Sequence, residues 1–313
     1  MKKDQQATMP LARKRKNWLT LLDLMILPGA VYLLINNYVP MLGLFIAFKK
    51  INYGLGIFKS PWVGFQNFVY LFTTRDAYII TRNTILYNIT FIILLNAVGI
   101  AVGIMLSEVK KRRMSKFYQT TILLPQLISI IIIANIVYAF LSGEYGFLNK
   151  TILPALGLPS ISFYSEPKFW PFILTFVNIW KGLGYASVIY YAAVIGIDRE
   201  FYEAALVDGA NKRQQIFKIT LPMLKPTIIT LVLINVGRIF YSDFGLFYQV
   251  PMNAGALFNA TNTIDTYVYR ALLQLNNIAM ASAAGFYQSV VGFVVVLLAN
   301  LLVRKLDADS ALF

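Results

Sequence analysis

The chain has 313 residues, of which 58% are hydrophobic and 13% are charged. A soluble domain usually carries about a quarter charged residues, so this apolar excess indicates a membrane protein. Cysteine and histidine are both absent, which excludes a disulfide, a Cys/His metal site, a cysteine nucleophile and an imidazole proton relay. The net charge of +14 would suit nucleic-acid binding, but the positions of the charges indicate a different role for it.

Six segments are apolar and long enough to cross a bilayer, which takes roughly 20 residues. They are predicted at about 19–47, 83–107, 119–141, 169–197, 226–247 and 284–303. Pro28 and Pro40 interrupt the first segment and predict a kink or a tilt. We therefore expect an all-α membrane protein, a polytopic bundle of about six transmembrane helices. Its membrane domain would cover 19–305, between a basic N-terminal segment 1–18 and a tail 306–313.

The positions of lysine and arginine predict the orientation of this bundle. The N-terminal segment, the 108–118 and 198–225 loops and the C-terminal tail hold 18 of these residues, and the loops of the other side hold eight. Because cytoplasmic loops are enriched in lysine and arginine, both termini are predicted to be cytoplasmic in a multi-pass protein. The basic excess is thus an orientation signal, and no nucleic-acid partner is expected.

The stretch EFYEAALVDGANKRQQIFKITLP, residues 200–222, is charged and rich in helix formers, yet it lies between two apolar segments. A short helix through FYEAALV would place Phe201, Ala204 and Ala205 together at helical spacing. Gly209 can adopt a positive φ and end that helix in a sharp turn. A second helix through KRQQIFKI is predicted, with Pro222 closing it before the next span.

The pattern E-A-A, three residues, G, nine residues, I-x-L-P matches this stretch at every defined position. It resembles the signature loop of binding-protein-dependent ABC importer permeases. The segments 180–210 and 264–273 are also similar to the carbohydrate branch of that family, and most of all to its subgroup for complex oligosaccharides and polysaccharides, such as alginate- or pectin-type importer permeases. The resemblance extends from about residue 18 to the C-terminus.

The resemblance implies a type I importer architecture in the bacterial cytoplasmic membrane, working by alternating access. The 198–225 loop would carry a coupling helix that passes motion from an ATPase, with the residues Glu203, Ala204, Ala205, Asp208, Gly209, Ile219, Leu221 and Pro222. The partners would be a second permease of a different chain, two ATPase subunits and an extracytoplasmic binding protein. The chain has no G-x-x-x-x-G-K-[ST] phosphate loop, so ATP and Mg²⁺ would be used by the separate ATPase. We expect no catalysis and no bound cofactor in this chain.

Polar residues inside two spans indicate a solute pathway, because ionisable groups at bilayer depth usually face a cavity or a partner. On the fourth span Asn178, Lys181 and Tyr185 share one helical face. On the fifth, the same spacing joins Asn235, Arg238 and Ser242, with Tyr241 and Asp243 beside them. Two cations would suit an acidic, uronate-containing saccharide.

Other interpretations of these residues stay open. Lys181 could extend to the membrane surface or belong to a W-K-G sequence that is usual in the resembling subgroup, and Arg238 could pair with Asp243. A neutral sugar or another cargo is compatible with the same importer class. An ion-coupled secondary transporter would need buried acidic residues, and the spans offer only Asp23 and Asp243. A membrane enzyme would need clustered acidic groups, which are scattered here.

Two further patterns concern packing. Gly99 and Gly103 form a small-xxx-small pair in the second span, which predicts close helix packing. The aromatic segment 56–72 predicts either a short helix along the membrane surface or a loop that caps the bundle.

Overall fold

The computed structural model of the protein describes residues 21–306, with side chains over 24–305. Within this range the regular elements are helices, apart from one isolated β-bridge between Lys49 and Trp62. This confirms the predicted all-α class. The chain divides into two compact units, Met1–Phe45 and Ile46–Phe313. The predicted N-terminal segment 1–18 and the tail beyond residue 306 lie outside the described residues.

The first unit holds most of the first predicted span. Helix α1 (Leu21–Leu33) continues through Pro28 into a π-helical turn over Leu34–Tyr38 and the short α2 (Val39–Met41). Val39, the residue just before Pro40, donates its N–H to the Leu34 carbonyl five residues earlier. Proline lacks an N–H and crowds the carbonyl four residues before it. The wider turn therefore lets the helix continue past Pro40.

Five helical stretches within residues 21–306 have the length and hydropathy of a membrane span: Leu24–Phe48, Arg75–Ser107, Pro167–Ile195, Lys212–Val236 and Ile278–Lys305. A sixth consists of two helices, Arg112–Leu127 and Ile130–Leu141, which are bent by 92°. The prediction of about six spans is thus confirmed. Several predicted bounds differ from these helices: the second span starts at Arg75, the fifth runs from Lys212 to Val236, and the sixth starts at Ile278. The third span, predicted as one segment, is bent.

Short helical turns precede the second span. They are α3 (Gly56–Lys59), a 3-10 turn over Gly64–Phe68 and α4 (Tyr70–Thr73). Segment 56–72 is thus a series of turns instead of one surface helix. Phe68 packs against Phe286 of α16, with ring centroids 5.8 Å apart. This contact favours the bundle-capping interpretation of the aromatic segment.

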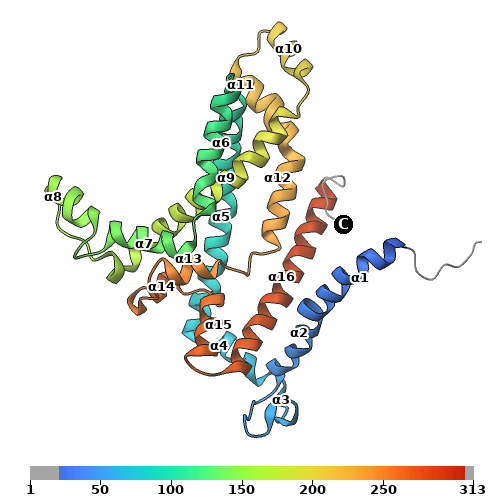
Figure 1. Cartoon of the computed structure of the whole chain (residues 1–313), viewed down its shortest axis with the longest axis vertical. Coiled ribbons are helices and arrows are strands. Elements are labelled where there is room, and N and C mark those ends of the chain that lie inside the picture. The colour runs from blue at the N-terminus through green and yellow to red at the C-terminus, as the bar shows by residue number, and fades with distance from the viewer. Residues whose placement is uncertain (1–20, 307–313) are drawn as a thin grey trace, which may run out of the picture. The chain divides into compact units, whose positions relative to one another are not determined.

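The long helix α5 (Arg75–Ser107) starts where the Thr74 side chain accepts a hydrogen bond from the Ala77 N–H. The bend in the third span lies between α6 (Arg112–Leu127) and α7 (Ile130–Leu141). Pro125 stands in the last turn of α6, and Ile128 and Ser129 have extended backbones. These residues end α6, so α7 leaves in a new direction (Figure 1).

Helix α9 (Trp170–Ile195) packs along α5 and against α6, and the three lie side by side in Figure 1. A Cβ at Gly99 would lie 3.0 Å from the Ala186 Cβ, and one at Gly103 would lie 2.8 Å from the Tyr190 Cβ. Glycine is needed at both positions because the backbones approach closely. The packing role predicted for this glycine pair is confirmed.

The remaining helices of the second unit are α8 (Leu153–Ala155), α10 (Arg199–Val207), α11 (Lys212–Gln215), α12 (Leu221–Val236), α13 (Phe244–Gln249), α14 (Phe258–Thr261), α15 (Ile264–Leu273) and α16 (Ile278–Leu306). Helices α10 and α11 extend beyond the ends of α6, α9 and α12 (Figure 1). A buried core joins α5, α7, α9 and α13 around Trp170, Leu174 and Phe247.

Candidate functional site

The segment between α9 and α12 folds into the predicted helix and turn. The Asp198 side chain caps the start of α10 by accepting a bond from the Glu200 N–H at 3.1 Å. At its other end Gly209 has φ +75°, and its N–H bonds the Leu206 carbonyl at 3.0 Å. The Ala210 N–H bonds the Ala205 carbonyl at 2.8 Å, which completes a Schellman turn. This turn reverses the chain beyond α10.

Helix α10 presents an unusual surface to solvent. Glu203, Ala204 and Asp208 are exposed, and Ala205 is half-buried. Exposed apolar side chains surround them, with 50% of Phe201, 62% of Leu206 and 89% of Val207 accessible. Exposed apolar residues on a short projecting helix are typical of a docking surface for another protein.

One prediction about this segment is wrong. Pro222 does not close the second helix, because α11, a π-helical turn over Ile216–Thr220 and α12 follow one another without a break. The π turn just before Pro222 lets the helix continue past this proline, as the π turn before Pro40 does. Ile219 is half-buried, and Leu221 packs against a core cluster that includes Ile104 and Val194. Motion of this segment can therefore pass directly into α12.

A second prediction is also wrong, since the fifth span does not carry its polar residues on one helical face. Helix α12 ends at Val236, and residues 237–243 form turns and extended backbone before α13. Asn235 therefore shares no helix with Arg238 or Ser242. Glycine at position 237 is a weak helix former, and side chains from neighbouring helices offer this backbone other partners.

Three side chains hold the non-helical segment 237–243. Asn88 of α5 donates to the Ile239 and Tyr241 carbonyls, both at 2.9 Å. Gln288 of α16 donates to the Phe240 carbonyl at 2.8 Å, and Asp265 of α15 accepts from the Ser242 N–H at 2.7 Å. Irregular backbone at membrane depth is tolerated where protein groups satisfy it or where it lines a cavity.

The structure does not gather the predicted pathway residues into one pocket of this chain. Asn178 and Lys181 are half-buried on α9, and Tyr185 is 65% exposed. The others are exposed on or beside the non-helical segment, namely Asn235, Arg238, Tyr241 and Asp243. Asp243 caps α13 through a bond from the Leu246 N–H at 3.1 Å. The alternative interpretation, an Arg238–Asp243 pair, does not hold, since the Arg238 side chain has no partner within residues 24–305.

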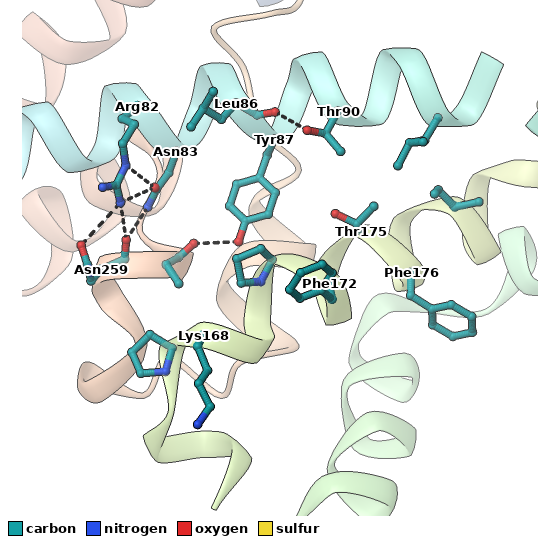
Figure 2. Close-up of a pocket in the computed structure, with 15 residues that line it drawn as sticks. Arg82, Asn83, Leu86, Tyr87, Thr90, Lys168, Phe172, Thr175, Phe176 and Asn259 are labelled. Carbon is teal, nitrogen blue, oxygen red and sulfur yellow. Dashed lines mark hydrogen bonds between the residues drawn. The ribbon is translucent and has the colours of Figure 1, made fainter. Parts of the chain in front are cut away.

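A groove of about 1000 Å³ lies between α5 and α9 (Figure 2). Phe172, Phe176 and Ile179 line it from a face of α9 different from that of Lys181. At its polar end Arg82 donates to the Asn259 carbonyl at 2.8 Å. Lys168 and Thr175 add polar groups to a wall that is otherwise largely apolar. The lining contains none of the predicted pathway residues, so the groove differs from the predicted pathway.

Comparison with known proteins then decides the family. Residues 99–308 match the family described as binding-protein-dependent transport system inner membrane component. The chain belongs to this family. Protein LplB of Bacillus subtilis (strain 168) is 33% identical to the permease over 300 residues, which cover 96% of the chain and 92% of LplB.

Two further matches are similar in extent. The polygalacturonan/rhamnogalacturonan transport system permease protein YteP of Bacillus subtilis (strain 168) is 35% identical and covers 92% of this permease and 89% of YteP. A chain in the crystal structure of a bacterial ABC transporter for import of the acidic polysaccharide alginate matches with a TM-score of 0.83 and 35% identity, covering 92% of this chain and 96% of that chain. The predicted ABC importer permease architecture is confirmed, and the relatives are transport subunits instead of enzymes.

Sequence analysis missed the residues that brace the permease's projecting segment. Tyr202 of α10 and Thr220 share a hydrogen bond of 2.9 Å between their hydroxyls. Lys212 at the start of α11 forms an ion pair of 2.6 Å with Glu108, which follows α5. No local spacing links positions 104 residues apart, so only the fold reveals this contact. Asn88 and Gln288 gave a weak signal, as polar residues within apolar spans.

Proposed function

We propose that this permease imports an acidic oligosaccharide, or a polysaccharide of the same chemistry, by alternating access across the bacterial cytoplasmic membrane. It would form half of the pathway, and a second permease chain would form the other half. Two ATPase subunits would use ATP and Mg²⁺, and an extracytoplasmic binding protein would deliver the solute. The observation that carries the choice of cargo is Arg238, an exposed cation without a partner on the non-helical segment between α12 and α13.

The exposed position of Arg238 supports a pathway between two permeases. A guanidinium at bilayer depth is too costly to face lipid, so it needs an aqueous path or a partner. Tyr185 and Asn235 are exposed as well. A surface of exposed polar groups that is closed by a second subunit would form a hydrated route. The arginine would then pair with carboxylates of a uronate chain.

The exposed surface of α10 supports coupling to an ATPase. Phe201, Leu206 and Val207 would enter a cleft of the motor, and Glu203 would lie at the rim of that cleft. The small side chains of Ala204 and Ala205 would permit close approach. Asp208 and Gly209 would shape the turn, and the continuous helix from Lys212 to Val236 would transmit the motion through Ile219, Leu221 and Pro222.

Arg238→Gln is the test of the proposed cargo. In proteoliposomes that hold the complete importer, we expect uptake of oligogalacturonate to fall about tenfold while uptake of a neutral oligosaccharide changes little. One lost hydrogen bond between the arginine and a saccharide carboxylate corresponds to about 1.5–3 kcal/mol. Arg304→Gln, at an exposed cation in the last turn of α16, is the control and should affect neither cargo. Equal losses for both cargoes in Arg238→Gln would contradict an acidic substrate.

The predicted orientation has a separate test. A protease-cleavable tag placed after Phe313 should resist protease added outside spheroplasts and become sensitive only after the membrane is opened. The reason is the excess of lysine and arginine on the same side of the spans. A tag inserted after Gly157, in a loop predicted for the other side, should be cut in intact spheroplasts. The reverse pattern would place the projecting segment outside the cell and contradict ATPase coupling.

A further inference from the structure

A basic cavity of about 630 Å³ lies where three helices end. It is lined by residues from the end of α5, the loop that follows, the start of α6, the end of α9 and the first residue of α10. Four of these residues are cations: Lys110, Arg112, Lys116 and Arg199. The cavity differs from the predicted solute pathway, because its lining contains none of the predicted pathway residues.

The four cations are not neutralised by the rest of the described chain. Their side chains have no ion pair or hydrogen bond with residues 24–305, and all four are exposed. The carboxylate in the lining, Glu108, is already paired with Lys212 at 2.6 Å. The cavity thus concentrates positive potential in a small space, which an anionic ligand would relieve.

The walls of the cavity indicate which anion fits. Tyr191 and Ile195 line it beside the cations, and Ile195 is 58% exposed. Within the adjacent helices Met105 and Phe117 are 68% and 62% exposed. The ends of spans lie at the boundary between bilayer and water. A ligand with its phosphate at the level of the cations would therefore have apolar protein surface beside it, on the side of the hydrocarbon.

We propose that this cavity binds the headgroup of an anionic phospholipid. The shared chemistry is a phosphate, and the apolar wall selects a lipid over a soluble phosphate. Basic pockets between transmembrane helices bind such headgroups on the cytoplasmic side. The proposal rests on the proposed function only for the orientation of the permease in the membrane, which places the cavity at the cytoplasmic leaflet.

A bound lipid would contact the coupling segment at Arg199, which lines the cavity. Arg199 is the first residue of α10, and Glu108 holds Lys212 at the start of α11. The lipid phosphate would anchor Arg199 to the membrane surface from the same cavity. The headgroup would therefore restrain α10 relative to α5 and α6. The Tyr202–Thr220 hydrogen bond is a separate restraint, which ties α10 to the π turn before α12.

The test compares two double variants of the full-length permease in its importer complex. Arg112→Gln/Lys116→Gln removes two cations of the lining. Lys111→Gln/Arg113→Gln removes two exposed cations of the same segment that do not line the cavity. Native mass spectrometry with added phosphatidylglycerol, phosphatidylcholine or inorganic phosphate measures binding to each complex. Because both variants lose the same charge, general surface attraction changes equally in the two.

We expect the unmodified complex to retain one phosphatidylglycerol in preference to phosphatidylcholine. The lining variant should bind it about tenfold more weakly, and the control variant should bind it like the unmodified protein. Equal weakening in both variants, equal retention of the two lipids, or competition by inorganic phosphate at similar concentration would overturn the proposal. Loss of the ATPase from the lining variant would assign the surface to that subunit instead. Saccharide uptake is not part of this assay, so failure here leaves the proposed cargo untouched.

Discussion

Replacement of Gly209 by valine should leave the importer assembled and hydrolysing ATP while transport falls about tenfold or more. Gly209 has φ +75°, where an L-residue costs roughly 1–2 kcal/mol and a β-branched one costs more. The cost is relieved if the Schellman turn opens, which frees α10 to rotate relative to α11. The ratio of ATP hydrolysed to solute imported, measured in proteoliposomes, reports this loss of coupling directly.

Gly157→Val is the matched control for this variant. Gly157 has φ +66°, its N–H bonds the Pro154 carbonyl, and the Leu158 N–H bonds the Leu153 carbonyl. It therefore suffers the same backbone strain after a different helix, α8. Neither glycine has an atom within 4 Å of an added Cβ, so steric clashes do not separate the two variants. Normal coupling in Gly209→Val, or equal uncoupling in both, would contradict the role given to the α10 turn.

The projecting segment was the most predictable part because its signals are local. Helix α10 ends just before Gly209, because this glycine adopts a positive φ that other residues disfavour. Spacing could not reveal the π turn before Pro222. A proline in a helical pattern normally predicts a break, whereas three prolines here follow a π turn by two positions: Pro40, Pro154 and Pro222. The wider turn has no local sequence signature.

The end of α12 could not be predicted, because its causes lie far away in the chain. Residues 237–247 are apolar enough to continue a helix, yet Asn88, Asp265 and Gln288 offer the backbone partners from three other helices. Tertiary hydrogen bonds therefore replace the helical ones. The bent third span has a mixed origin, since Pro125 marks the site but the 92° angle depends on packing of α7 against α13.

The positions of the candidate pathway residues were predictable from the sequence to different degrees. Lys181 and Tyr185 stand on a regular helix, as expected, and their relative positions follow from spacing. Arg238 stands on backbone that Asn88 and Gln288 hold in place, so its position depends on side chains of two other helices.

The largest effect on stability is expected from Gly184→Val. Gly184 lies where α9 crosses α6, and a Cβ at this position would overlap the Ile122 carbonyl and lie 2.7 Å from the Leu123 Cα. Both are backbone atoms, so no side chain can rotate away and the helices must separate. We expect the free energy of unfolding of the detergent-purified subunit to fall by more than about 3 kcal/mol, with alanine giving a smaller loss in the same direction.

Gly285→Val tests whether the loss comes from the helix crossing. Gly285 also lies inside a long helix, α16, but no atom lies within 4 Å of an added Cβ. Valine has a slightly better helix propensity than glycine, so this variant should unfold at the same temperature as the unmodified protein or slightly above it. Thermal unfolding followed by circular dichroism, together with the folded yield, compares the two. If Gly184→Val were as stable as Gly285→Val, α6 and α9 would not pack backbone to backbone at this crossing.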